Sequence, residues 1–455
     1  MKLLGEKKMD HFLNDNKVKI VGVIFGLLIG IILSLFPFIK GLKIVFGLIG
    51  VILIFYRPEF GLYLTVFTLP LIPFRYVVLL FGLVVISFII KMIRDDDFKF
   101  KEIPIKYSIG LFVIPLIFAG ITSITLKLSM TKLLVYIIAF LFLFLTTNLI
   151  DSKAKFYCLI VVLIISATIV GLYGVYQYKA GVELKESWVD KELNPDIQTR
   201  VISTFDNPNV LAEYLILTIP ITFALLWNAN SIFKKLLFLL SAAIQGLCIL
   251  LTFSRGGWLG IFLAMLIFAI FVDRRLFLLY IAGGVGLIAL SPKAIMTRIS
   301  TIGNMEDSSI SYRFPLWKAT IDMIKDYWIN GVGLGLNAFK AVYPRYMRQG
   351  IVAVHSHNIF LQMFVESGIF GIIGFIAFIF SSIRLNLITF AKGIDIKMKR
   401  ISISVFASIA GIFLHGLVDN IFFSDRIVLM LWVLISLGIT GYLLEFDKNL
   451  EKCNE

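Results

Sequence analysis

Long apolar segments recur from one end of this chain to the other, and they limit the folds that it can adopt. A helix needs about 20 mostly apolar residues to span a bilayer. Segments that approach this requirement occur at 20–39, 42–56, 60–74, 76–93, 104–124, 130–150, 156–177, 208–228, 236–253, 257–272, 276–291, 356–384, 401–418 and 426–445. Because several of them are short, the sequence predicts 12 to 14 membrane-spanning helices.

Composition agrees with this interpretation. Hydrophobic residues make up 59% of the 455 positions, charged residues only 16%, and the mean hydropathy is +0.93. Such a chain cannot cover a soluble surface. The predicted fold class is therefore an all-α integral membrane protein, a polytopic helix bundle, with a large extracytoplasmic loop at 292–355 that carries short helices. Cys158 and Cys248 fall inside predicted helices and Cys453 in the tail, so no disulfide framework is expected.

The distribution of basic residues orients the bundle. With both termini in the cytoplasm, the inside segments hold 24 of the 43 Lys and Arg residues, and most of the others lie in the long outer segments 178–207 and 292–355. Long loops cross a membrane largely regardless of their charge. The net charge of +14 is thus attributed to topology and to contact with anionic membrane lipid, not to nucleic acid. We expect a multi-pass protein of the cell (plasma) membrane.

This orientation gathers the polar motifs on the extracytoplasmic side. Gln198–Asn209 ends the first long outer segment, Thr252–Gly257 follows a predicted helix, and the 292–355 loop ends at His355 and His357. Beyond the histidines, Asn358, Gln362 and Glu366 repeat every four residues and form a polar stripe along one helix face. A membrane helix keeps such a stripe only where it is paired or faces a wet cavity.

The residue types in these motifs suit one chemistry. The arginine fork binds phosphate oxygens in pairs, which fits Arg200, Arg255 and Arg313 to a membrane-embedded polyprenyl pyrophosphate. A histidine near neutral pKa can take the proton of an acceptor hydroxyl as it attacks a sugar carbon. These residues together predict glycosyl transfer from a lipid pyrophosphate, without a metal or another cofactor, because fixed cations stabilise the leaving group.

The chain resembles the O-antigen ligase and O-antigen polymerase superfamily of bacterial membrane glycosyltransferases. The resemblance covers roughly residues 195–440 and is carried by Arg200 with Thr204–Ala212, Ser254–Gly257, Arg313 with Trp317, Gly331–Gly335, and His357-Asn358 followed by Leu361, Glu366, Gly368 and Gly371. It implies an undecaprenyl-pyrophosphate glycan donor, inversion at the anomeric carbon, Arg200, Arg255 and Arg313 on the pyrophosphate, and His357 as the catalytic base. The acceptor is expected to be a glycan, lipid or protein.

The chain then divides into N-terminal transmembrane helices (1–177), a ligase-like catalytic region (178–445) and a cytoplasmic tail (446–455). A polymerase that joins lipid-linked repeat units is the alternative function, and a lipid-linked oligosaccharide flippase is a second alternative. A flippase should carry its charges at mid-membrane, whereas here the arginines cluster at the outer face beside a long loop.

Each candidate residue also has a structural interpretation. Arg200 and Arg255 would serve as headgroup anchors, Arg313 would pair with Asp307 or Asp322, and the His355/His357 pair would bind a metal if a further ligand were near. His355 and Glu366 are further candidates for substrate binding. Glu366 is equally suited to locking helix packing and to orienting His357, and His355 would have a supporting role. The i,i+4 spacing of His415 and Asp419 predicts that these two residues form a structural pair.

Overall fold

The computed structural model describes residues 34–446 apart from 186–187, 191, 274, 276, 279–292 and 303–307, together with positions 23, 27 and 31. Within these residues the protein is entirely helical, with no strand. Most of the predicted helices at 276–291 and 20–39 and the tail beyond Phe446 lie outside the described residues.

Nine described helices are long and apolar enough to cross a membrane, which confirms a multi-pass bundle. They are α2 (Phe38–Tyr56), α4 (Phe74–Arg94), α6 (Leu126–Leu149), α7 (Lys153–Ala180), α8 (Pro208–Asn228), α9 (Ile232–Leu251), α10 (Arg255–Val272), α16 (Ile359–Lys392) and α18 (Asp425–Phe446). The remaining apolar helices are α3 (Pro58–Thr68), α5 (Lys106–Ile121) and α17 (Ile396–Gly416). The 292–355 loop contains α12 (Lys293–Ser300), α13 (Ser308–Ser311), α14 (Arg313–Asp326), α15 (Leu336–Val342) and the 3₁₀ turn η2 (Tyr343–Arg345).

One departure from prediction is α3, which was expected at 60–74 and has only 11 residues. It ends at Thr68 because Pro70 and Pro73 lack the N–H groups that would continue the helical hydrogen bonds. Proline also moves the start of α2, which begins directly after Pro37 although the sequence placed the break at residues 40–41. Apolarity alone did not locate these ends.

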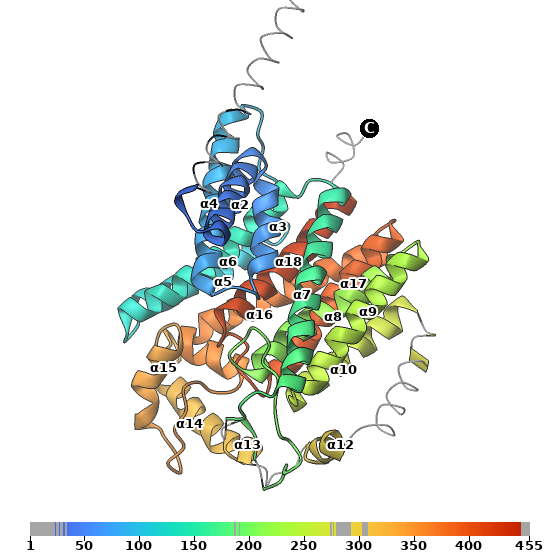
Figure 1. The fold of residues 1–455 in the computed structure, drawn as a ribbon. Helices are drawn as coiled ribbons and strands as arrows, with labels where there is room; N and C mark the ends of the chain where they lie inside the picture. The colour runs from blue at the N-terminus through green and yellow to red at the C-terminus, as the bar shows by residue number, and fades with distance from the viewer. Residues whose placement is uncertain are drawn as a thin grey trace, which may run out of the picture.

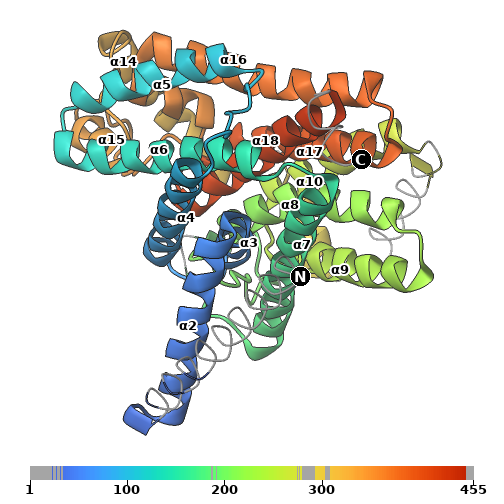
Figure 2. The same ribbon diagram turned by 90° about the horizontal axis from the view of Figure 1, so that it is seen from above.

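The core of the bundle is formed by α8 and α18, whose most apolar stretches are 83% and 89% buried. Helix α17 packs beside them (Figures 1 and 2). The helices α10 and α17 approach closely at Gly260 and Gly411. A Cβ atom on either glycine would clash with the carbonyl oxygen of the other. Such small residues let membrane helices pack backbone to backbone.

Helices α12 to α15 lie together at one end of the bundle, which we call the loop end (Figure 1). The motifs around Asn209, Arg255 and His357 also meet here, because α8, α10 and α16 all begin at this end and are joined to it by the contacts described below.

The helix α16 is broken at Gly368, which has φ 68° and ψ −169°. The loop segment 328–335 supplies hydrogen-bond partners for the backbone groups at this break. Val332 N–H donates to Val365 O (2.8 Å), Gly333 N–H donates to Glu366 O (3.1 Å), and Ile369 N–H donates to Trp328 O (2.7 Å). Broken backbone is tolerated at membrane depth only where other protein groups satisfy it. Backbone hydrogen bonds therefore attach the loop to α16 directly after the polar stripe.

Candidate active site

His357 and Asp419 form the centre of the polar cluster at the loop end. His357 Nδ1 lies 3.0 Å from Asp419 Oδ1, and their side chains are 23% and 10% exposed. His357 has φ +49°, a conformation that non-glycine residues adopt rarely and at a cost. The next residue, Asn358, caps α16 by accepting the N–H groups of Phe360 and Leu361. The cap and the turn together fix the imidazole in front of Asp419.

Asp419 lies between α17 and α18 and uses both carboxylate oxygens. Besides His357, Oδ1 accepts the backbone N–H of Asn420 (2.8 Å), and Oδ2 accepts Asn209 Nδ2 (2.8 Å). Burial alone would raise the pKa of Asp419, but the hydrogen bond and the charge of His357 lower it well below its usual value. Asp419 is therefore ionised at neutral pH, and its carboxylate accepts a hydrogen bond from His357.

His355 packs directly on His357, with 4.0 Å between the ring centroids. The backbone N–H of His357 donates to His355 Nδ1 (3.2 Å). Burial, reinforced by the charge of His357, lowers the pKa of His355 to about 3, so its ring is neutral at pH 7. His355 thus supports the position of its neighbour as an uncharged hydrogen-bond acceptor.

The ligand atoms of His355, His357 and Asp419 lie within 4.8 Å of one another, so these three residues have the spacing of a metal site. From the sequence, metal binding by the two histidines depended on a further ligand, and Asp419 was not identified as that ligand. Two imidazoles and a carboxylate are ligands that zinc accepts. The same three residues also form a hydrogen-bonded base with its orienting carboxylate.

Arg313 begins α14 beside the histidines. The ring of Tyr312 contacts His357 edge-on at 5.4 Å, and the guanidinium of Arg313 lies 5.6 Å from the centroid of the same tyrosine ring. The Nε atom of Arg313 is buried and makes no hydrogen bond within the described part of the chain. A buried N–H without a partner is costly, so this arginine retains a donor for a ligand.

Arg200 has a different environment. It is 4% exposed, and its guanidinium donates to the carbonyl oxygens of Thr252 (2.7 Å) and Trp188 and to Asn209 Oδ1 (3.1 Å). Burial, followed by the charges of Arg298 and Arg255, lowers its pKa to about 9, which keeps it charged at pH 7. Because Asn209 in turn donates to Asp419, Arg200 joins the site through a hydrogen-bonded chain that ends at His357.

Arg255 begins α10 and donates to the carbonyl (2.8 Å) and hydroxyl (3.1 Å) oxygens of Thr301, just after α12. On α12, the buried Arg298 donates through Nε to Phe253 O (3.2 Å). The charges of Arg255 and Arg298 both act on Arg200, so three arginines gather at the loop end. Arg298 was not singled out in the sequence because no motif surrounds it.

Glu366 lies apart from His357. It accepts Gln362 Nε2 (2.7 Å), and Gln362 Oε1 accepts the backbone N–H of Ser356 (2.8 Å). The polar stripe of α16 therefore links Glu366 to the backbone of the histidine turn, while the side chain that orients the His357 ring is Asp419.

The predicted pair of His415 and Asp419 lies close in the structure, with ligand atoms within 4.8 Å, but its hydrogen bonds in the described residues go to other partners. Helix α17 ends at Gly416, so the two residues are not on consecutive turns of one helix. His415 Nε2 instead lies 3.2 Å from Glu213 Oε1 of α8, with both side chains 2% exposed. Asp419 is released to the loop after α17, where it meets His357 and Asn209.

Comparison with known proteins identifies a related family. Residues 214–376 match the protein family described as O-Antigen ligase. This region runs from α8 to the middle of α16 and includes Arg255, Arg298, Arg313, His355 and His357. No curated protein matches the chain.

Proposed function

The chain belongs to the O-antigen ligase family through residues 214–376, and we propose that it transfers a glycan from a polyprenyl pyrophosphate to an acceptor hydroxyl. As a membrane enzyme of this family it acts on lipid-linked glycans. The finer proposal is that the loop end faces the extracytoplasmic side, that both termini are cytoplasmic, and that His357 is the catalytic base. The observation that carries the catalytic role of His357 is its contact with Asp419.

The roles of the two imidazole nitrogens of His357 follow from that contact. Asp419, being ionised, accepts the Nδ1 proton, which leaves the lone pair of His357 on Nε2. The acceptor hydroxyl transfers its proton to Nε2 while its oxygen forms a bond to the anomeric carbon of the donor. The bond from that carbon to the pyrophosphate oxygen breaks, and the pyrophosphate leaves with the electron pair. Attack from the face opposite the leaving group inverts the anomeric carbon.

The arginines divide into two roles in this proposal. Arg313 keeps a buried donor that has no partner among the described residues, and we assign it, with Arg255 and Arg298, to the pyrophosphate. Their charges would stabilise the negative charge that develops on the leaving group. Arg200, which donates to Asn209 Oδ1 and through Asn209 is linked to Asp419, is instead a positioning residue for these two side chains.

Analysis of a deletion strain tests the function and separates a ligase from a polymerase. Full-length glycan chains left on the lipid carrier are expected for a ligase, whereas short unpolymerised units would indicate a polymerase. Surface glycans and carrier-linked glycans identical to those of the parent strain would refute both. If the protein were the flippase considered from the sequence, its deletion would instead leave the lipid-linked donor on the cytoplasmic face of the membrane.

A further inference from the structure

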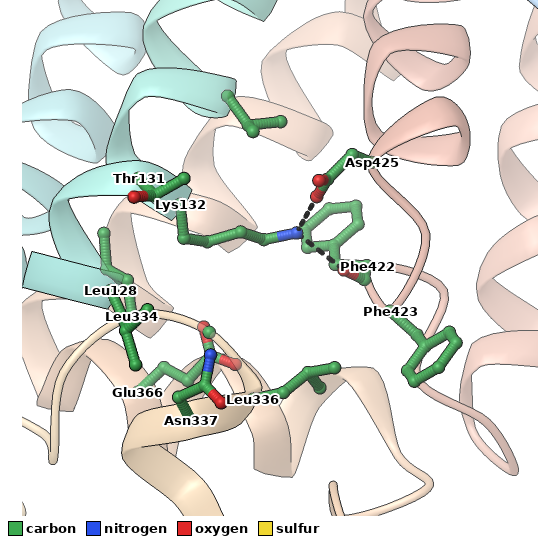
Figure 3. Close-up of a pocket in the computed structure, with 12 residues that line it drawn as sticks. Leu128, Thr131, Lys132, Leu334, Leu336, Asn337, Glu366, Phe422, Phe423 and Asp425 are labelled. Atoms are coloured by element: carbon green, nitrogen blue, oxygen red, sulfur yellow. Dashed lines mark hydrogen bonds and ion pairs between the residues drawn. The ribbon is translucent and has the colours of Figure 1, made fainter. Parts of the chain in front are cut away.

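A polar cavity lies next to the candidate active site. Its volume is about 200 Å³, and it is bounded by the start of α6, by α15 with the preceding turn, and by residues 422–425 before and at the start of α18 (Figure 3). Glu366 and Phe422 line it and are 4% exposed. Its rim contains the exposed residues Thr131, Asn337 and Phe423. The cavity thus has buried walls and an open polar mouth.

Charge excludes phosphate as the natural occupant. Lys132 Nζ lies 2.6 Å from Asp425 Oδ1 and donates to Phe422 O (2.9 Å), so its charge is already neutralised. Glu366 faces Lys132 and Asp425 across the cavity and contributes no positive charge (Figure 3). The lining residues include no arginine. The candidate phosphate-binding arginines therefore lie outside this cavity.

The lining suits a neutral polyhydroxyl ring. The carboxylates of Glu366 and Asp425 accept hydrogen bonds, and the amide of Asn337 both donates and accepts them. Phe423, with 40% of its surface exposed, supplies an apolar face at the rim. A few convergent polar groups among apolar walls are typical of small-molecule sites. The volume corresponds to about six or seven water molecules, enough for one sugar ring.

The cavity also adjoins the histidines. The ring of Phe423 lies 5.2 Å from that of His355, which in turn packs on His357 at 4.0 Å. The loop after α17 contains both Asp419 and the cavity residues Phe422 and Phe423. One short segment therefore joins the proposed base and the cavity.

We propose that this cavity binds a neutral sugar residue of the glycan acceptor and holds it beside His357. The inference rests on the proposed function, since it assigns the acceptor to one side of the base and the lipid pyrophosphate to the arginine side. Lys132 then has a positioning role, because it fixes Asp425 and the backbone of Phe422 in the cavity wall.

Filling the mouth of the cavity tests the assignment. Asn337→Trp places a large ring at the exposed rim, and Ala341→Trp is its control, because Ala341 is exposed on the same helix and does not line the cavity. Binding of a panel of methyl hexopyranosides to the purified full chain is measured by saturation-transfer NMR. We expect at least one pyranoside to bind wild type and Ala341→Trp alike, and to bind Asn337→Trp at least about tenfold more weakly. Glu366→Gln, which keeps the shape and the bond from Gln362, should weaken binding by about tenfold as well.

The donor supplies an independent readout. Undecaprenyl pyrophosphate should raise the thermal unfolding midpoint of wild type and of all three variants equally, which also shows that the variants are folded. Failure of every pyranoside to bind, equal binding by the two tryptophan variants, or displacement of the pyranoside by inorganic phosphate would overturn the acceptor cavity. Absence of stabilisation by undecaprenyl pyrophosphate in the wild type would count against the proposed function instead.

Discussion

Asp419 Oδ1 lies 3.0 Å from His357 Nδ1, although the two residues are 62 positions apart in the chain. The contact joins the turn before α16 to the loop after α17. Through Asn209, the second carboxylate oxygen extends the same network to Arg200. The carboxylate of Asp419 thus connects three segments of the chain at the loop end.

We expect Asp419→Asn to abolish most of the activity without unfolding the protein. Both carboxylate oxygens accept hydrogen bonds, so an amide must present its NH₂ group either to His357 or to the NH₂ group of Asn209. The rate of glycan transfer should fall on the order of 10²- to 10⁴-fold. Transfer is measured with carrier-linked glycan and the purified chain, and Asp206→Asn, an exposed carboxylate at the same end, is the control. A loss of only a few fold would remove Asp419 from the chemistry.

His357→Ala should lower the transfer rate on the order of a hundredfold or more while the donor still binds, because the base is removed and the arginines remain. Donor binding is followed by thermal stabilisation with undecaprenyl pyrophosphate. Normal transfer by this variant would exclude His357 as the base. Loss of donor binding would show that the imidazole acts in recognition rather than in proton transfer.

A chelator should leave the wild-type enzyme fully active, because the proposed leaving-group charge is stabilised by arginines. The measurement is the transfer rate before and after dialysis against EDTA. Inhibition that added zinc reverses would instead assign His355, His357 and Asp419 as metal ligands, since their ligand atoms lie within 4.8 Å of one another.

Lysine substitutions should distinguish the two arginine roles. Arg313→Lys keeps the charge but loses the two-pronged geometry, so activity should fall at least about tenfold with an unchanged unfolding midpoint. Arg200→Lys breaks bonds to Thr252, Trp188 and Asn209 in a buried position, so it should lower both activity and the unfolding midpoint. Equal effects of the two substitutions on stability would contradict this division.

His355 should make the protein less stable as the pH falls. Burial lowers its pKa from 6.5 to about 3 in the folded state, so between these values only the unfolded chain takes up the proton. The free energy of unfolding should then decrease by up to about 1.4 kcal/mol per pH unit below pH 6.5. Asp419, whose folded pKa is lowered, loses its contribution only below about pH 4.

The unfolding midpoint measured in detergent from pH 7 to pH 4.5 checks this expectation. His355→Gln, which keeps a hydrogen-bond acceptor but does not titrate, should flatten the profile relative to wild type. Parallel profiles for the two proteins would show that another group causes the pH dependence.

Much of the fold could be predicted because hydropathy and turn residues are local signals. The match was closest for α8, where Asn207 caps the helix and Pro208 occupies its first position, as expected at 208–228. Hydropathy could not anticipate that α3 stops after 11 residues or that α16 breaks at Gly368, because prolines and a long-range loop contact decide those points.

The candidate site was predictable only in part. The motifs around Arg200, Arg255 and His357 indicated which segments carry polar function, and the structure brings these segments to one end of the bundle. The contact of Asp419 with His357 was not predicted because His415, four residues earlier, offered a simpler partner. The observed contact is possible because α17 ends at Gly416, before Asp419. Tertiary pairings of this kind leave no trace in the spacing of one sequence.

The loop segment that completes α16 also determines how a substrate can enter. Lifting Val332 and Gly333 away would leave their N–H groups and the carbonyls of Val365 and Glu366 without partners, and several buried bonds would be lost at once. This stretch is therefore a fixed wall rather than a hinged cover. Under the proposed function, a donor carried on a long lipid would then reach the histidines sideways from the bilayer, between helices, with its polyprenyl tail still in the membrane.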